Sequence, residues 1–305
     1  MSGSERHVPV LLQQAIRFLD VRPGGVYIDA TLGFAGHASA IARLMGANGR
    51  LICFDRDPGA MALARERLAA LGEGLGAAMP HVDFHDVEFS RAAELVEPGS
   101  VDGLLADFGA SSMHFDDAQR GFSFQAEGPL DMRMNPRHGP TAAQVVNQTG
   151  EKELADLIYE FGEERRSRRI ARAIVRARPI TTTAQLARVV AAAAPAMKQE
   201  RLRQHLHPAT RTFQALRIYV NAELEEIEAL LKAAPGLLKP GGRLVVISFH
   251  SLEDRLAKDA LREGAQQGVY EILTRKPVTA EAEETDRNPR ARSAKLRAAE
   301  RKSRD

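Results

Sequence analysis

The sequence has little cysteine, no long apolar run and almost no net charge. Its single cysteine, Cys53, cannot form an internal disulfide, and such sparse use is typical of a reducing cytoplasm. Because Cys53 lies in an apolar segment, we expect it to be an inert core residue. The lack of a long apolar stretch argues against a membrane-spanning helix, and the polar start at residues 1–6 is unlike a signal peptide. We therefore expect a cytoplasmic protein, and 305 residues suffice for one large domain or two ordinary ones.

The net charge of +2 hides an uneven distribution of arginine. Arginines crowd into residues 165–178 and again into residues 287–304. A run of like charge is commonly the solvated face of a helix, and it is also the kind of surface that contacts nucleic-acid phosphates. The charge pattern alone leaves both interpretations open.

The most informative stretch runs from Val26 to His37. An apolar strand ends at Asp29, a turn of small residues follows, and a helix then begins. α/β proteins build nucleotide pockets in this way, because glycines allow the backbone close to a ligand and the start of a helix offers unpaired N–H groups. The same arrangement also occurs in sheets that bind nothing.

Strands and helices alternate through the first 110 residues. Apolar strands are predicted at residues 26–29, 51–55, 82–85 and 101–107. A helix starts at Asp57-Pro58, where an N-cap is followed by proline at the first helical position. Alternation at this spacing is typical of parallel βαβ units.

From residue 111 to about residue 208 the sequence has no convincing strand and shows helical apolar spacing. We therefore predict an α/β sheet formed by residues 1–110 and 209–305, with an all-helical domain inserted at residues 111–208. The α/β part is expected to resume with one long helix over residues 213–231. Strands are then predicted at residues 243–248 and 269–273, and the basic tail from Asn288 onward is expected to pack loosely.

Two acidic residues stand at strand ends in this pattern. Asp55 ends the second strand, where a carboxylate can accept hydrogen bonds from both hydroxyls of a ribose, and Asp107 ends the fourth. In a parallel sheet these ends converge with the Gly33–Gly36 turn on one crevice. The alternatives are that Asp55 caps a helix and Asp107 forms a turn.

Two nucleotide-type ligands compete for this crevice. A dinucleotide requires the full G-x-G-x-x-G spacing, which Gly33-Phe34-Ala35-Gly36-His37 lacks. S-adenosylmethionine needs no pyrophosphate cradle. The turn Lys239-Pro240-Gly241-Gly242 before the strand at 243–248 also fits the methyltransferase version of the fold better.

Long motifs along the chain resemble the RsmH (MraW) family, cytosine-N4 methyltransferases of small-subunit ribosomal RNA. The matching segments are His7–Leu12, Tyr27–Thr31, Arg120–Phe124, Gly128–Met134, Gly162–Arg165, His207–Ala215, Ile247–Arg255 and Asn288–Ser293. The resemblance implies a class I, Rossmann-like methyltransferase sheet with an inserted helical domain. It also implies N4-methylation of a cytidine at the decoding centre, in the P-site region of 16S rRNA, with S-adenosyl-L-methionine as cofactor.

The resemblance also implies the cofactor contacts. They are Ala35, Gly36, His37, Asp55, Phe89, Asp107 and His114. The family usually has glycine at the position of Ala35, and alanine suits that position if its φ is negative. The family usually has glutamine where this chain has His114.

The expected chemistry is a displacement at the sulfonium methyl group by the exocyclic amine of cytosine, a poor nucleophile. The enzyme must align the amine and accept a hydrogen bond from it, and Asp107 with the carbonyls of Phe108–Gly109 are the candidate acceptors. His250 is a candidate to take the proton late; the alternative is a hydrogen-bonded strand-end residue. No covalent cysteine mechanism is expected, and no residue cluster predicts a metal.

RNA is the expected partner, specifically 16S rRNA within the small ribosomal subunit, with no membrane contact and a monomer or homodimer as the working form. The predicted RNA contacts are Arg133, Arg165, Arg166, Arg169 and Arg211. One alternative is a methyltransferase of the same fold acting on another nucleobase or on DNA. A second is a non-catalytic RNA-binding assembly factor that retains the pocket. A nicotinamide-dependent oxidoreductase is disfavoured by the spacing of the turn.

Overall fold

The computed structural model describes residues 9–194 and 207–303. The chain forms two compact units, one from residues 1–109 and 224–305 and the other from residues 110–223. In the described residues, no helix combines the length and the apolar character needed to cross a bilayer.

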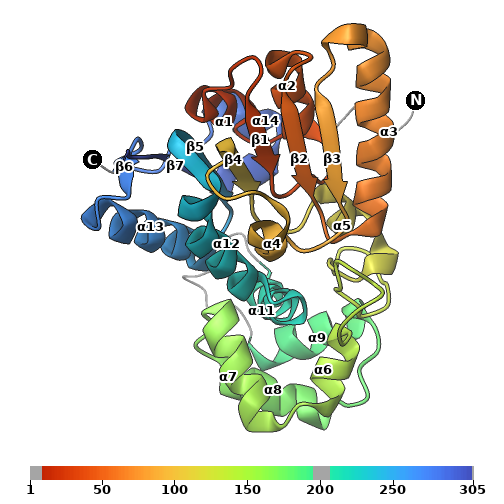
Figure 1. The fold of residues 1–305 in the computed structure, drawn as a ribbon. Coiled ribbons are helices and arrows are strands. Elements are labelled where there is room, and N and C mark those ends of the chain that lie inside the picture. The colour runs from red at the N-terminus through yellow and green to blue at the C-terminus, as the bar shows by residue number, and fades with distance from the viewer. Residues whose placement is uncertain (1–8, 195–206, 304–305) are drawn as a thin grey trace. The chain divides into compact units, whose positions relative to one another are not determined.

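The first unit is built on a seven-stranded sheet in the order β3-β2-β1-β4-β5-β7-β6 (Figure 1). The strands are β1 (Val26–Asp29), β2 (Arg50–Phe54), β3 (His81–His85), β4 (Val101–Asp107), β5 (Leu238–Ser248), β6 (Tyr270–Ile272) and β7 (Lys295–Arg301). The first five run parallel, and β7 is antiparallel to both of its neighbours. The chain leaves β1 in one direction toward β3 and returns to β4 on its other side, which creates the crevice where α/β sheets bind ligands. This sheet confirms the predicted Rossmann-like α/β class.

Helices cover both faces of this sheet, because alternate side chains of each strand point to opposite faces. The helices of the unit are α1 (Leu12–Leu19), α2 (Gly36–Met45), α3 (Pro58–Leu75), α4 (Ala92–Leu95), α12 (Glu223–Leu237), α13 (Ser251–Gln266) and α14 (Ala282–Arg287). Tyr27 of β1 packs with α1, α2 and α3, whereas its neighbour Ile28 packs with α4, α12 and α13. The sheet therefore has a well-packed core on each of its faces.

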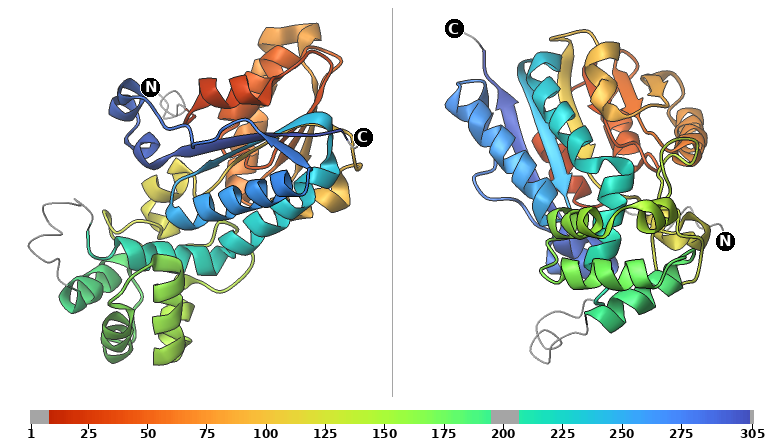
Figure 2. Two further views of the ribbon diagram at one scale, coloured as in Figure 1. Left: turned by 90° about the vertical axis from the view of Figure 1, so that its left-hand side faces the viewer. Right: turned by 90° about the horizontal axis from the view of Figure 1, so that it is seen from below.

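The C-terminal segment was expected to pack loosely, and this expectation is wrong. β7 lies between β5 and β6, and Figure 2 shows it in dark blue beside β5. Leu296, Ala298 and Ala299 are fully buried. The basic residues between them hid this pattern, yet Arg297 is neutralised by Asp254, with Nε to Oδ1 at 2.7 Å. A cation inside a strand is tolerated where a carboxylate meets it.

The second unit is helical in its described part. It contains α5 (Ser112–Asp116), α6 (Ala142–Gln148), α7 (Glu151–Gly162), α8 (Ser167–Arg176), α9 (Thr183–Ala193) and α11 (Thr210–Asn221), with one isolated bridge between Pro129 and Thr182. Leucine, isoleucine and valine side chains from these helices form its core.

The long helix predicted over residues 213–231 is in fact two helices. Ala222 adopts a left-handed conformation with φ 49°, and it separates α11 from α12. The Asn221 side chain holds this break, because its Nδ2 donates to Met132 O at 2.8 Å and its Oδ1 accepts from Met134 N at 2.7 Å. α11 packs in the helical unit through Phe213 and its neighbours. The second boundary therefore falls at residues 223/224 rather than at the predicted 208/209.

Candidate active site

The turn between β1 and α2 contains a left-handed residue that the local sequence does not predict. Ala35 lies in the left-handed region, with φ 55° and ψ 32°, so the condition under which alanine suits this position is not met. This conformation costs an alanine about 1–2 kcal/mol. It is held in place because Ala35 N donates to Leu32 O at 2.7 Å and Ala35 O accepts from Ser39 N at 2.9 Å. The alanine methyl group is fully buried in the core.

Gly36 lets the N-terminal segment pack onto this turn. A Cβ at Gly36 would lie 2.3 Å from Cγ of Pro9, so only glycine fits without movement. Next to it, His37 Nε2 lies 3.1 Å from the carbonyl oxygen of Val10. The N–H of Leu11 donates to Glu284 Oε1 at 2.6 Å, which ties the segment to α14. Sequence reasoning quoted residues 7–12 as a family match but gave them no role; His7 and Val8 lie outside the described residues.

Asp55 connects the turn to the start of α3. Its Oδ2 accepts from Gly33 N at 2.8 Å, and its Oδ1 accepts from Asp57 N at 2.8 Å. The N-cap of α3 is Asp57, whose Oδ1 accepts from Gly59 N at 2.8 Å. The two oxygens of a carboxylate can together accept several hydrogen bonds.

Asp107 ends β4 next to the same turn. Its N–H donates to Thr31 Oγ1 at 2.6 Å, and its Oδ2 lies 3.8 Å from His37 Nδ1. Its Oδ1 is buried and has no hydrogen-bond partner among the described residues. Burial and the nearby carboxylates of Asp29 and Glu253 raise the pKa of Asp107 well above its ordinary value.

Asp29 ends the neighbouring strand and is almost completely buried. Burial raises its pKa to about 7, although the N–H of Thr31 donates to its Oδ1 at 3.1 Å. Because β1 pairs with β4, Asp29 and Asp107 belong to the same end of the sheet. The crevice thus contains carboxyl groups whose charge is sensitive to their surroundings, as is common at functional sites.

Aromatic rings line the ends of β2, β3 and β4. Phe89 follows β3, and its ring centroid lies 6.2 Å from that of Phe108. His85 stacks on Phe54 at 4.9 Å between ring centroids, and burial lowers the pKa of His85. Phe54 and Phe108 are buried in the core, whereas Phe89 and His85 are partly exposed and can offer ring surface to a ligand.

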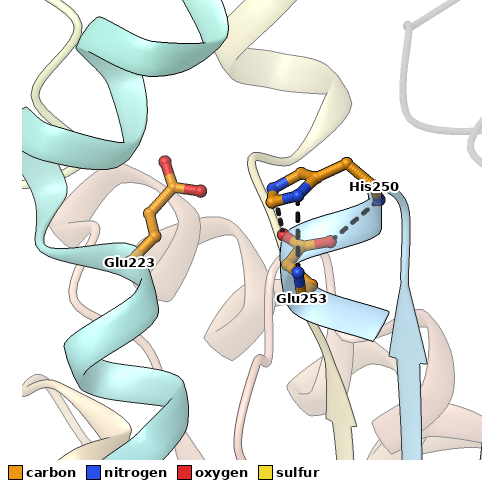
Figure 3. Close-up of side chains that lie close together, drawn as sticks. All are labelled: Glu223, His250 and Glu253. Carbon is orange, nitrogen blue, oxygen red and sulfur yellow. Dashed lines mark hydrogen bonds and ion pairs between the residues drawn. The ribbon is translucent and has the colours of Figure 1, made fainter. Parts of the chain in front are cut away.

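His250 caps the N-terminus of α13. Its Nδ1 lies 3.5 Å from Glu253 N, and its Nε2 lies 3.1 Å from Glu253 Oε1 (Figure 3). Glu253 Oε2 in turn accepts from Phe249 N at 2.7 Å and from His250 N at 3.2 Å. These contacts hold the His250 ring at the end of β5 and the start of α13.

Sequence reasoning missed Glu253. The side chain is fully buried, and its Oε1 lies 3.5 Å from where a Cβ of Gly109 would be. The spacing of His250 and Glu253 is that of a capping box, in which the residue three positions after the N-cap reaches back to it. That spacing was the available signal.

His114 and the predicted RNA-contacting arginines lie in the second unit. His114 is buried, stacks on Phe122 at 4.7 Å between centroids, and accepts from Ser111 N at its Nδ1 at 3.1 Å. One edge of its ring is thus occupied by a capping interaction within its own helix.

The predicted arginines differ in their surroundings. Arg133 makes a bidentate pair with Asp131, with both nitrogen–oxygen distances at 2.8 Å, and this pair lowers the pKa of Asp131. Arg166 pairs with the buried Glu164, with Nε to Oε1 at 3.2 Å. Arg211 donates to the carbonyl of Glu163 at 3.3 Å. Arg165 and Arg169 are exposed, as are Arg168, Arg172 and Arg176.

The first unit therefore brings together Ala35, Gly36, His37, Asp55, Phe89 and Asp107 at one end of its sheet. His250 lies at the end of the next strand, since β4 pairs with β5. Chemically, this end offers backbone N–H groups at a helix start, carboxylate acceptors and the partly exposed rings of His85 and Phe89.

Comparisons with known proteins agree with one another. A model of the MraW methylase family matches residues 4–302. A protein of Acidobacterium capsulatum called ribosomal RNA small subunit methyltransferase H is 78% identical over 298 residues, which cover 98% of this chain and 99% of that protein. A protein of the same name from Koribacter versatilis is 60% identical, covering 97% of this chain and 94% of its own length. One from Sorangium cellulosum is 53% identical, covering 97% and 91%.

Proposed function

Because the chain belongs to the MraW methylase family, we propose that it transfers a methyl group from S-adenosylmethionine to 16S rRNA of the small ribosomal subunit, at N4 of a cytidine in the decoding centre. The observation that carries the proposal is Asp107. Its carboxyl group ends β4 beside the turn that begins α2, and its Oδ1 is buried with no hydrogen-bond partner among the described residues. An acceptor in that state is suited to an incoming N–H group.

The residues of the crevice fit the parts of the cofactor. Asp55, which already holds the turn and the start of α3, would accept hydrogen bonds from the ribose hydroxyls. Ala35, Gly36 and His37 open α2, and the start of a helix suits the carboxylate of the methionine part. The ring of Phe89 would lie against the adenine. His114 is also proposed as a cofactor contact.

When bound, the cofactor supplies a methyl group on a sulfonium centre. Asp107 would hold the exocyclic amine by accepting a hydrogen bond from one of its hydrogens, with the carbonyls of Phe108 and Gly109 as further acceptors. As the new carbon–nitrogen bond forms and the carbon–sulfur bond breaks, the amine loses a proton, and Asp107 is the nearest candidate to receive it. His250, which caps α13, would shape the pocket rather than act as the base.

Exposed arginines of α8 and of the turn before it support RNA as the substrate. Arg165 and Arg169 make no ion pair within the described residues, so their guanidinium groups can meet phosphates. Arg133, Arg166 and Arg211 already hold partners in the helical unit. We therefore assign phosphate contact first to Arg165 and Arg169.

The test is transfer of labelled methyl groups from S-adenosylmethionine to unmodified small subunits, followed by nucleoside analysis. We expect N4-methylcytidine as the product and its loss in Asp107→Asn. Asp259→Asn, which changes an exposed aspartate on α13, is the matched control and should keep full activity. Label in another nucleoside would contradict the assignment of cytidine as the target and would still agree with a methyltransferase fold. Cofactor binding without transfer to subunits or naked RNA would favour a non-catalytic assembly factor.

A further inference from the structure

The orientation of the His37 ring determines where it carries a proton. The side chain is buried, and its Nε2 lies 3.1 Å from the carbonyl oxygen of Val10. A carbonyl oxygen only accepts hydrogen bonds, so Nε2 must be the nitrogen that carries hydrogen in the neutral ring. The N-terminal segment thereby selects the tautomer of His37.

The other ring nitrogen faces the catalytic carboxyl group. Nδ1 of His37 lies 3.8 Å from Oδ2 of Asp107. With Nε2 protonated, a neutral ring would turn the lone pair of Nδ1 toward a carboxylate. A proton on Nδ1 converts that repulsion into an ion pair, so this geometry favours a protonated ring next to an ionised Asp107.

The charges around Asp107 oppose its ionisation. Asp29 approaches from β1 and Glu253 from α13, and both carboxylates oppose ionisation of Asp107. The contact with His37, from α2, is the one ion pair that Asp107 makes among the described residues. A protonated Asp107 would donate a hydrogen bond rather than accept one from an amine. A protonated His37 ring would favour the ionised form of Asp107.

We propose that His37 is a positioning residue that acts through Asp107: protonated at Nδ1, it keeps the Asp107 carboxylate ionised and ready to accept a hydrogen bond from the substrate amine. The inference rests on the proposed function, because it gives His37 a part in handling the amine. It also assigns a role to residues 9–11, whose Val10 carbonyl holds the ring.

The first experiment measures the protonation of His37 directly, without substrate. Protein labelled with 15N at its nine histidines is titrated by NMR, and the His37 resonances are identified by their loss in His37→Gln. We expect hydrogen on Nε2 in the neutral ring and a titration midpoint above the ordinary histidine value of about 6.5. Asp107→Asn, which leaves the ring in place, should lower that midpoint by about one pH unit or more.

Two outcomes would overturn the proposal: a neutral ring protonated at Nδ1, or a midpoint that Asp107→Asn leaves unchanged. If His37→Gln does not fold, single replacement of each of the other eight histidines identifies the His37 resonances by elimination, and the effect of Asp107→Asn on them decides. This readout needs no methyl transfer. If the RNA target proves to be wrong, the NMR result on His37 still stands. If the NMR result contradicts the role of His37, the RNA target is not affected.

The second experiment compares pH profiles of methyl transfer. In His37→Gln the acidic limb of kcat/KM should move up by about one pH unit, because Asp107 loses the cation that favours its ionised form. Activity should recover as the pH is raised further. A merely structural role for His37 would lower the rate by the same factor at every pH, and that result would contradict the proposal.

Discussion

Replacing Gly36 with alanine tests whether the N-terminal segment is held tightly on the turn before α2. The new Cβ would lie 2.3 Å from Pro9 Cγ and 3.3 Å from Pro9 Cβ and Cδ, so either the segment or the turn must move. Overpacking of this kind costs about 1–3 kcal/mol of stability. For a unit of this size, that loss lowers the melting temperature by roughly 2–10 °C. Movement of the segment would also release His37 from Val10, so we expect weaker binding of S-adenosylmethionine.

Thermal unfolding and calorimetric titration with the cofactor provide the two measurements. Gly74→Ala is the matched control, because Gly74 lies in α3 with no atom within 4 Å of a new Cβ. It should leave binding unchanged and raise stability by about 0.5–1 kcal/mol. If Gly36→Ala melts and binds like the wild type, Pro9 does not restrain the turn, and the account of this segment is wrong.

Three further predictions follow from other parts of the structure. Ala35→Gly should change the free energy of unfolding by less than about 1 kcal/mol. Glycine removes the steric cost of the left-handed conformation, and this gain offsets the greater entropy of the unfolded chain and the loss of the buried methyl group. A loss above ~2 kcal/mol in denaturant unfolding would contradict the assigned backbone conformation. Asp29 binds its proton more tightly in the folded state, so its contribution to stability falls as pH rises from about 4 to about 7, by up to ~4 kcal/mol. Asp29→Asn should therefore gain stability over the wild type across that range, and parallel stability curves would argue against the raised pKa. Replacing Arg165 and Arg169 together with alanine should reduce the slope of log affinity for RNA against log salt by about 2, whereas Arg133→Ala should mainly destabilise the helical unit; an unchanged slope in the double variant would remove these arginines from the RNA surface.

The alternation of strands and helices was predictable because it is local. Each β-strand of the first 110 residues appears close to its predicted bounds, and Asp57-Pro58 does begin α3. The convergence of Asp55 and Asp107 on the Gly33–Gly36 turn followed from the geometry of parallel strands. Periodicity and strand ends therefore sufficed to find the crevice.

What the sequence could not reveal depends on tertiary contacts. The left-handed Ala35 has no local signal, since only its hydrogen bonds and burial hold it there. The break at Ala222 depends on Asn221 reaching Met132 and Met134, far away in sequence. Glu253 gained its place beside Asp107 only when β5 paired with β4. Residues that are distant in the chain decide each of these features.

The position of β7 also affects how the protein is made. A ribosome releases the five parallel strands first, and β7 emerges last although it belongs between β5 and β6. Until then the outer edge of β5 has no partner, and β6, which pairs only with β7 in the sheet, has nothing to join. A nascent chain halted before residue 295 would lack β7, and β6 could then not join the sheet either. The seven residues of β7 thus complete the sheet by joining β6 to β5.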